Sequence, residues 1–261
     1  MCLAKSPNKF NRLYVQAEPI SEEFLTSIES GLAKLDPKDR VRVLTENFSW
    51  SPTEARNLWA FSSTNLLVDT TRAIQYMHES RDSIVAAFNW VAKEGVLAEE
   101  PLRGSRFNIV DAVLHSDAIH RGGGQLIPCA RRAIYASQMT ASPGVMEPVY
   151  LVEINCPVTA MGGVYSTLSQ KRGSVVETIQ KSNMVTVRGH LPVVECFGFA
   201  KILRENTSGQ AFMQCFFDHW KLVEGDAMEE KTRANDVVMQ IRKRKGLPMQ
   251  LPELSRYLDT L

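Results

Sequence analysis

Hydrophobic residues recur with two different periods in the first half of the chain. Apolar residues at every second position predict strands at residues 2–4, 13–17 and 106–114. The first two strands flank a polar turn at residues 5–12, so this segment is predicted to form a hairpin. Apolar residues spaced three and four apart predict helices that begin near Ser21, Asp36, Ser51, Asp69 and Leu126. The Ser51 capping box precedes Leu58 and Trp59 in this helical pattern.

The pattern changes after residues 140–148, where Pro143-Gly144 and Glu147-Pro148 indicate a domain boundary. Beyond it, the predicted elements are strand 149–154, helix 158–170, strands 174–179 and 184–191, helix 195–204 and strand 212–220. This β-α-β-β-α-β order is typical of the ferredoxin-like arrangement. Both halves mix helices and strands, so an α+β protein is predicted.

The tail from Asp226 is predicted to return to helix and to end in a short amphipathic turn. The helix presents Val237, Val238 and Ile241, and the turn presents Leu254, Tyr257, Leu258 and Leu261. Four consecutive cations, Arg242 to Lys245, stand at the end of the helix. They either complement the negative end of the helix dipole or contact RNA, and the sequence leaves both readings open.

Composition excludes several classes of protein. The 261 residues are 44% hydrophobic and carry a net charge of +1, which allows a substantial core but gives the whole molecule no electrostatic attraction to nucleic acid or membrane. Five scattered cysteines argue against a disulfide framework and for a reducing compartment, and we interpret them as core thiols. No apolar run is long enough to span a membrane, and no signal peptide is evident, so a cytoplasmic protein without membrane contact is expected. A phosphate-binding Gly-x4-Gly-Lys-Ser/Thr motif is absent.

Residues 114–125 carry the most informative chemistry in the chain. They read Leu-His-Ser-Asp-Ala-Ile-His-Arg-Gly-Gly-Gly-Gln, between a predicted strand and a predicted helix. The glycines are expected to let backbone N–H groups approach a partner, or to shape a turn with His120 at its tip. The following helix N-terminus favours an anion. His120 and Arg121 are therefore predicted to be exposed.

A metal site and a catalytic site are both poorly supported. His115 and His120 lie five residues apart, which separates them on a helix and places them on opposite faces of a strand, so no metal ligand set is predicted. Cys129 lies nearby but falls within a helical pattern, where packing is the usual role of a thiol. Gly-x-Ser-x-Gly and paired-carboxylate motifs are absent, so no catalytic residue is predicted.

Recognition of a nucleic-acid backbone remains as the alternative. Residues 9–12 and 117–124 combine cations, amide groups and glycine backbone, which bind phosphate and sugar without reading base sequence. Phe10 either stacks on a base or ribose or covers the core of its own hairpin.

Five sequence strings together carry a family resemblance: Ser-Pro-Asn-Lys from Ser6, the residues 114–125 given above, Met-Glu-Pro-Val-Tyr-Leu-Val-Glu-Ile from Met146, Gly-Gln-Ala-Phe from Gly209 and Arg-Lys-Arg-Lys-Gly-Leu from Arg242. They resemble the eukaryotic elongation factor 2 family. The resemblance follows the whole chain in order, but it covers only the C-terminal domains IV and V of that family. The GTPase domain falls outside it, so this chain is expected to have no enzymatic activity or cofactor of its own; GTP and magnesium would bind elsewhere in the full-length protein.

The resemblance implies a fold and a set of domains. Domain IV of the family is similar to domain 2 of ribosomal protein S5, and residues 1–147 with the returning tail 222–261 are expected to form it. Domain V is ferredoxin-like and is expected at residues 148–221.

The resemblance also implies a function. The family is the ribosomal translocase, whose domain IV enters the decoding region of the small subunit and holds tRNA and mRNA in register. By its match to the family motif, His120 is the residue converted to diphthamide, which implies the modifying enzymes and ADP-ribosylating toxins as partners beside the ribosome. A monomer is expected. The residues expected to contact tRNA, mRNA or ribosomal RNA are Ser6, Pro7, Asn8, Lys9, Phe10, Asn11, Arg12, Asp117, Ile119, Arg121, Gly122 and Gly123.

Two departures and one rival qualify the resemblance. The family usually has histidine where this chain has Phe10, so stacking is expected to replace a hydrogen bond or charge there. The loop at residues 62–65 is shorter than that of the family. The alternative is the spliceosomal relative of this factor, a small nuclear ribonucleoprotein component that shares His-Arg-Gly-Gly-Gly-Gln. Its residues before the histidine differ, which favours the translation factor.

Overall fold

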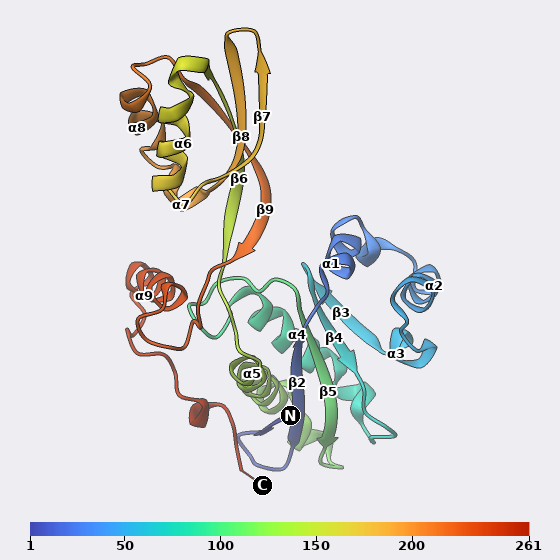
Figure 1. Cartoon of the computed structure of the whole chain (residues 1–261). Coiled ribbons are helices and arrows are strands. Elements are labelled where there is room, and N and C mark those ends of the chain that lie inside the picture. Colours follow the sequence, from blue (N-terminus) through green and yellow to red (C-terminus); the bar gives the residue numbers. More distant parts are fainter. Residues whose placement is uncertain (261) are drawn as a thin grey trace. The chain divides into compact units, whose positions relative to one another are not determined.

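The computed structural model describes residues 1–260 and divides them into two compact units (Figure 1). The first unit comprises Met1–Pro143, Asp226–Lys231 and residues 235–260, and the second comprises Gly144–Gly225 and Thr232–Ala234. Leu261, expected in the final amphipathic turn, lies outside the described residues.

The first unit is built on a five-stranded sheet with the strand order β1-β2-β5-β4-β3. Antiparallel pairing joins its strands except β4 and β5, which are parallel. The bounds are β1 (Cys2–Lys5), β2 (Arg12–Pro19), β3 (Leu58–Ser62), β4 (Asn65–Asp69) and β5 (Ser105–Val113). The predicted hairpin is β1 with β2, and β2 pairs in turn with β5, so the hairpin joins the rest of the sheet through β2.

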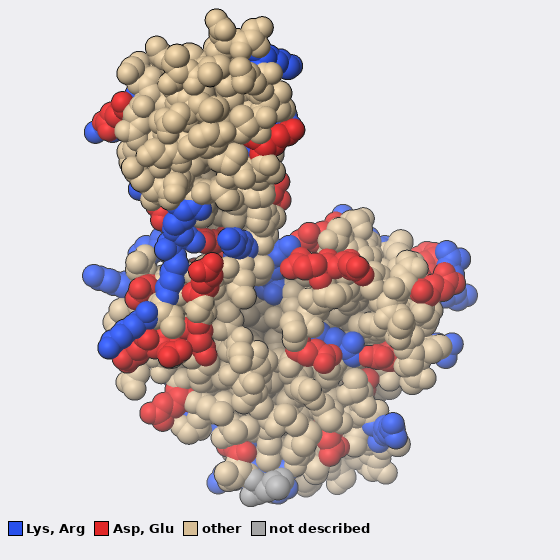
Figure 2. Space-filling model, viewed as in Figure 1, with Lys and Arg blue, Asp and Glu red and all other residues tan. Residues whose placement is uncertain are grey.

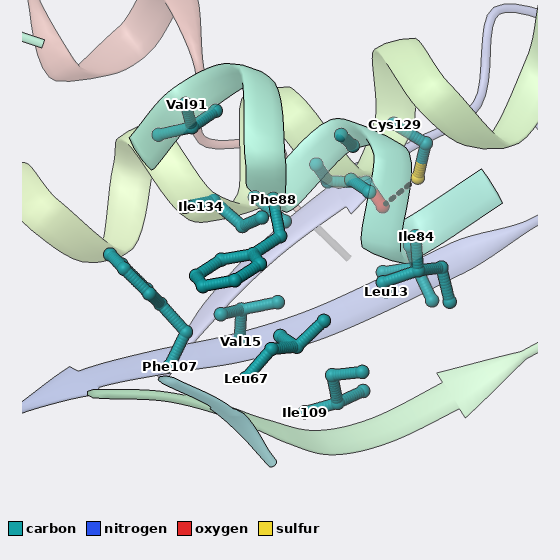
Figure 3. Packing of buried hydrophobic residues seen from close by; sticks show 14 of the residues in the cluster. Leu13, Val15, Leu67, Ile84, Phe88, Val91, Phe107, Ile109, Cys129 and Ile134 are labelled. Atoms are coloured by element: carbon teal, nitrogen blue, oxygen red, sulfur yellow. Dashed lines mark hydrogen bonds between the residues drawn. The ribbon is translucent and has the colours of Figure 1, made fainter. Parts of the chain in front are cut away.

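Two long helices, α4 (Met77–Lys93) and α5 (Gly123–Thr140), pack on this sheet. Figure 3 shows the core between them, where Phe88 and Ile134 of the helices meet Leu13 and Phe107 of the strands, all at most 1% exposed. Burying each such side chain stabilises the fold by roughly 1.5–3 kcal/mol. The Cys129 thiol donates to the backbone oxygen of Ala4, and burial raises the pKa of Cys129 to about 12, so this cysteine is a core thiol as predicted.

A second, smaller core lies under α1 (Glu22–Glu29), η1 (Leu32–Lys34), α2 (Pro37–Phe48) and α3 (Pro52–Arg56). Phe24 and Leu44 from these helices pack against Leu66 and Val68 of β4. The predicted caps at Ser21 and Ser51 are confirmed, because each side chain accepts the backbone N–H three residues later.

Two helix predictions in this region are wrong. The Ser51 helix ends at Arg56, and Leu58 and Trp59 belong to strand β3. The helix predicted from Asp69 begins at Met77: Asp69 is the last residue of β4, and residues 70–76 form an irregular connection to the helix. Leu66, Leu67 and Val68 are fully buried, because Leu67 faces the first core while Leu66 and Val68 face the smaller one. A short apolar run of this kind has no period that distinguishes a strand from a helix.

The second unit has the order β6 (Met146–Pro157), η3 (Val158–Ala160), α6 (Met161–Gln170), β7 (Ser174–Lys181), β8 (Met184–Pro192), α7 (Val193–Cys196), α8 (Phe199–Asn206) and β9 (Phe212–Leu222). Its antiparallel sheet has the order β7-β8-β6-β9, which confirms the ferredoxin-like prediction. The helix predicted at residues 195–204 is instead two helices. Gly198, at φ +79°, separates them, a conformation that glycine adopts without strain.

The tail forms α9 (Arg233–Lys245) and η4 (Leu254–Arg256). Arg242 is buried and donates to the backbone oxygens of Leu97, Pro248 and Gln250, while Lys245 donates to those of Ala98 and Glu99. Two of the four consecutive cations, Arg242 and Lys245, therefore hold the tail to residues 97–99. Among residues 1–260, no helix combines the length and the apolar character that a membrane crossing requires.

Candidate nucleic-acid interface

The turn between β1 and β2 is closed by its own polar side chains. Ser6 N–H donates to the Asn11 backbone oxygen at 2.9 Å, and Lys9 N–H donates to the Ser6 oxygen at 2.7 Å. The Ser6 hydroxyl accepts the Asn11 N–H at 3.0 Å and donates to Asn8 Oδ1. Lys9 adopts φ +62° at the apex of this turn. Ser6 and Asn11 are buried, so they shape the turn while Pro7, Lys9 and Phe10 face solvent.

The segment after β5 forms a second turn with its own cap. Asp117 accepts the Ile119 N–H at 3.0 Å and so caps the short helix η2 (Ala118–Arg121). Asp117 N–H donates to His115 Nδ1 at 3.0 Å, which fixes that ring nitrogen as an acceptor. These bonds hold residues 115–121 in one compact turn.

Two asparagine amides join the two turns at one atom. Asn8 Nδ2 and Asn11 Nδ2 donate to the backbone oxygen of His120, at 3.0 Å and 2.7 Å. Asn11 Oδ1 accepts the His115 N–H at 3.1 Å, and Asn8 N–H donates to Gln125 Oε1 at 2.9 Å. Residues 6–12 and 115–125 therefore form one structure, which we call the tip. The sequence placed both loops among the candidates but did not show that Asn8 and Asn11 connect them.

Three rings contact one another in the tip. The Phe10 ring centroid lies 5.1 Å from that of His115 and 4.8 Å from that of His120, and the two histidine centroids are 4.7 Å apart. Phe10 meets His120 edge to face, the arrangement that aromatic rings prefer. His120 is thus half-buried with its ring oriented by two neighbours, while Ile119 beside it is 84% exposed.

Arg121 is not exposed as predicted. Its side chain is only 6% exposed and donates to Glu79 Oε2 at 2.8 Å, and its guanidinium lies 4.2 Å from the centroid of the Tyr76 ring. Both partners come from the region around the start of α4, which carries no sequence signal for this contact. Arg121 therefore anchors the tip to the start of α4. The cations of the tip with exposed or half-exposed side chains are Lys9 and Arg12.

The three glycines also play a different part from the one expected. Gly122 has φ −59°, and neither Gly123 nor Gly124 has a positive φ, so no turn here requires glycine. Helix α5 begins at Gly123, three residues before the predicted start. A Cβ on Gly124 would meet no atom within 4 Å. Of the three glycines, Gly124 alone leaves open space at the start of α5, and the turn before the helix is made by the Asp117 cap and the asparagine amides.

The spacing argument that kept His115 and His120 apart does not apply to this structure. It assumed that both residues share one helix or one strand, whereas His115 precedes the single-turn helix η2 that contains His120, and the chain between them turns so that their rings meet. Within residues 1–260, three or more side chains with metal-ligating atoms converge only in the second unit, at His190, Asp218 and His219.

Charged side chains of both signs are interspersed on the face of the molecule that Figure 2 shows, in keeping with the net charge of +1. Beside the hairpin, Asp259 accepts the Lys5 N–H at 2.7 Å and a bond from Arg132 at 2.9 Å. Burial alone would raise the pKa of Asp259, but these two hydrogen bonds and the positive charges outweigh it, so the pKa lies below its ordinary value.

Two family profiles match the chain in succession. Residues 23–142 match elongation factor G, domain IV, and residues 144–231 match the elongation factor G C-terminus. The folds of these domains are those of ribosomal protein S5 domain 2 and ferredoxin, so the predicted fold class is confirmed for both units. His120 lies inside the first match, whereas the hairpin turn at residues 6–12 precedes it.

Proposed function

Because the chain carries domain IV and the C-terminal domain of elongation factor G, we propose that it is the C-terminal part of a GTP-dependent ribosomal translocase. Its tip enters the decoding region of the small subunit and stabilises the paired tRNA and mRNA during translocation. GTP hydrolysis belongs to a nucleotide-binding domain, which neither matched domain supplies. The factor acts as a monomer in the cytoplasm.

One observation carries the proposal. The His120 backbone oxygen accepts two amide hydrogen bonds from the hairpin, so the position of this histidine depends on a loop 109 to 112 residues away in the sequence. A hydrogen bond to an amide contributes about 1 kcal/mol, and two converging bonds fix a direction as well. A preorganised histidine of this kind suits a group that must reach a defined point on a partner.

The exposed groups of the tip suit the backbone of RNA. Lys9 supplies a cation for phosphate, Phe10 is 49% exposed for stacking, and Ile119 offers an apolar contact at the outermost turn. Asn8, Asn11 and Arg121 act indirectly: the two asparagine hydrogen bonds to His120 and the Arg121 ion pair with Glu79 hold this surface in shape.

His120 is also the proposed site of diphthamide. The modifying enzymes would extend its half-exposed ring, and ADP-ribosylating toxins would then transfer ADP-ribose from NAD to the finished group. His115, in contact with the same ring, is the internal comparison.

The modification is tested by mass spectrometry of the native full-length factor. Trypsin releases residues 107–121 as one peptide that contains both histidines. We expect the added mass of diphthamide, located by fragmentation at His120 and absent from His115. A peptide with two unmodified histidines would contradict the modification while leaving the translocase assignment to the next experiment.

The translocase function is tested with His120→Ala and Lys9→Ala in the full-length factor. We expect each variant to slow translocation and to increase frameshifting on programmed ribosomes. The matched control is Lys38→Ala, an exposed lysine of α2 outside the tip, which should behave as the parent protein. Parental behaviour of both tip variants would exclude the tip from translocation.

Association with particles separates the translation factor from the spliceosomal relative. The full-length factor is expected to sediment with ribosomes and to be released by high salt. Co-purification with splicing components in the absence of ribosomes would assign it to the spliceosomal relative.

A further inference from the structure

A cluster of two histidines and one aspartate lies on the sheet of the second unit, independently of the tip and of its proposed function. His190 belongs to β8, and Asp218 and His219 belong to β9; β6 runs between the two strands. In the register of the sheet, His190 stands opposite Leu151 and His219 opposite Val149. Leu151 and Val149 are two residues apart on β6 and share a face, so both histidines lie on that face and meet across the central strand.

An irregularity in β9 brings the aspartate to the same place. Val149 pairs with His219 and Tyr150 pairs with Phe217, which leaves Asp218 as an extra residue in a bulge. Consecutive side chains of a regular strand point to opposite faces, whereas a bulge redirects one of them. Asp218 Oδ2 therefore lies 2.6 Å from His219 Nδ1 and 3.3 Å from His190 Nε2, between the two rings.

The geometry suits a transition metal. One ligand atom from each residue lies within 4.8 Å of the others, and the ring centroids of His190 and His219 are 5.0 Å apart at an interplanar angle of 76°. Zinc bonds of about 2.0–2.1 Å in a tetrahedron place neighbouring ligands about 3.3 Å apart. The separation of His190 Nε2 from Asp218 Oδ2 already has this value, and the other atoms need small rotations of exposed side chains.

The donor set selects the class of metal. Two imidazole nitrogens with one carboxylate oxygen favour zinc and its neighbours over calcium or magnesium, which prefer oxygen ligands alone. The three side chains are 34%, 37% and 42% exposed, so solvent reaches the cluster and a water molecule has room to complete the tetrahedron. We propose that His190, Asp218 and His219 form a zinc site that links β8 to β9 across β6.

Zinc titration of the complete chain by calorimetry tests the proposal. After removal of metal with a chelator, we expect one equivalent of zinc to bind at pH 7.5. His190→Ala, His219→Ala and Asp218→Asn are each expected to weaken binding at least about 10-fold, since even the loss of a supporting residue costs a metal site about 10- to 100-fold. Each variant replaces a partly exposed side chain, and circular dichroism verifies that it folds.

The other pair of histidines supplies the control. A double variant, His115→Ala with His120→Ala, is expected to keep the single equivalent and its affinity. Cobalt should replace zinc and give the visible absorption of a tetrahedral site, and this absorption should be absent from His190→Ala. The proposal is overturned if the parent chain binds no zinc, if His190→Ala and His219→Ala bind it as the parent does, or if binding is lost with the tip pair instead.

Discussion

Each unit brings two histidine rings into contact, His115 with His120 in the tip and His190 with His219 on the second sheet, with centroids 4.7 Å and 5.0 Å apart. The surroundings differ. In the tip, Asp117 directs its carboxylate to the Ile119 N–H, and the His115 ring accepts a backbone N–H. On the sheet, the Asp218 carboxylate stands between the two rings.

This difference assigns different tasks to the same residue type. Hydrogen bonds in the tip are used to fix the backbone, so the His120 ring is positioned for another molecule. On the sheet the backbone is already fixed by strand pairing, and the side-chain atoms converge on one point that a metal ion can occupy. Variants of the tip and of Asp259 beside it test the first-unit side of the comparison, and none of them is expected to change zinc binding by the sheet cluster.

Asn11→Ala should have the largest effect on the tip. It removes the donor to His120 and the acceptor of the His115 N–H in a fully buried position, and an unsatisfied buried group costs about 1–3 kcal/mol. We expect the free energy of unfolding of the first unit to fall by about 2–3 kcal/mol. Denaturant titration followed by tryptophan fluorescence measures it in a Trp220→Phe background, because the remaining tryptophans Trp50, Trp59 and Trp90 all lie in the first unit.

Asn11→Asp is the matched control, because it keeps the shape and the acceptor but loses the amide donor. At pH 7 it should be at least as unstable as Asn11→Ala although the His115 N–H stays satisfied, because a buried carboxylate oxygen then faces the His120 backbone oxygen to which the amide donated. Equal stability of Asn11→Ala and the parent would show that the Asn11 hydrogen bonds to His115 and His120 do not hold the tip.

Arg121→Ala should destabilise the first unit by about 1.5 kcal/mol. The variant loses a charge-assisted hydrogen bond to Glu79, which is 62% exposed and so contributes less than a buried partner, together with the contact over Tyr76. Lys9→Ala, at the exposed apex, is the comparison and should change stability by less than about 0.5 kcal/mol. If the two variants were equally stable, Arg121 would not anchor the tip.

Gly124→Ala should stabilise the first unit by about 0.5 kcal/mol, because the helical backbone accepts alanine, a Cβ meets no atom within 4 Å and the unfolded chain loses freedom. Thermal unfolding of the same Trp220→Phe background measures the change. The variant also separates folding from function: if ribosomal RNA approaches the glycines closely, translocation by the full-length factor slows although the fold is more stable. Loss of stability would restore the expectation that the turn needs glycine.

Asp259→Asn should have the smallest effect, a loss of about 0.3 kcal/mol at pH 7, as is usual for a partly exposed ion pair. The folded pKa of Asp259 lies below its unfolded value of about 3.9, so the carboxylate stabilises the fold above that pH. The contribution is lost as the pH falls through the lower, folded pKa. Unfolding curves between pH 3 and pH 7 should therefore converge for parent and variant at the acid end; a constant difference would exclude this titration.

Local signals in the sequence were enough to predict many of the helices and strands. The caps at Ser21 and Ser51 depend on residues three positions apart, and the strand and helix periods after residue 148 extend over single elements, so the ferredoxin-like order could be predicted. Strands β3 and β4 could not, because their apolar runs are short and their state depends on pairing with β5. The spacing of apolar residues predicts one continuous helix at residues 195–204, and it contains no signal for the positive φ at Gly198 that separates α7 from α8.

The segments with polar and glycine-rich chemistry could be identified without the structure, since composition and turn residues act within a few positions of the chain. The sequence identified residues 9–12 and 117–124 as exposed segments suited to a nucleic-acid backbone, and His120 as the residue of interest. Three contacts could be seen only in the folded chain. Asn8 and Asn11 hold His120 by hydrogen bonds to its backbone oxygen. Arg121 is buried against Glu79 and Tyr76, and a bulge brings Asp218 to the same place as His219. Those contacts join residues brought together by strand register and helix packing, which are properties of the whole fold and leave no periodic trace in the sequence.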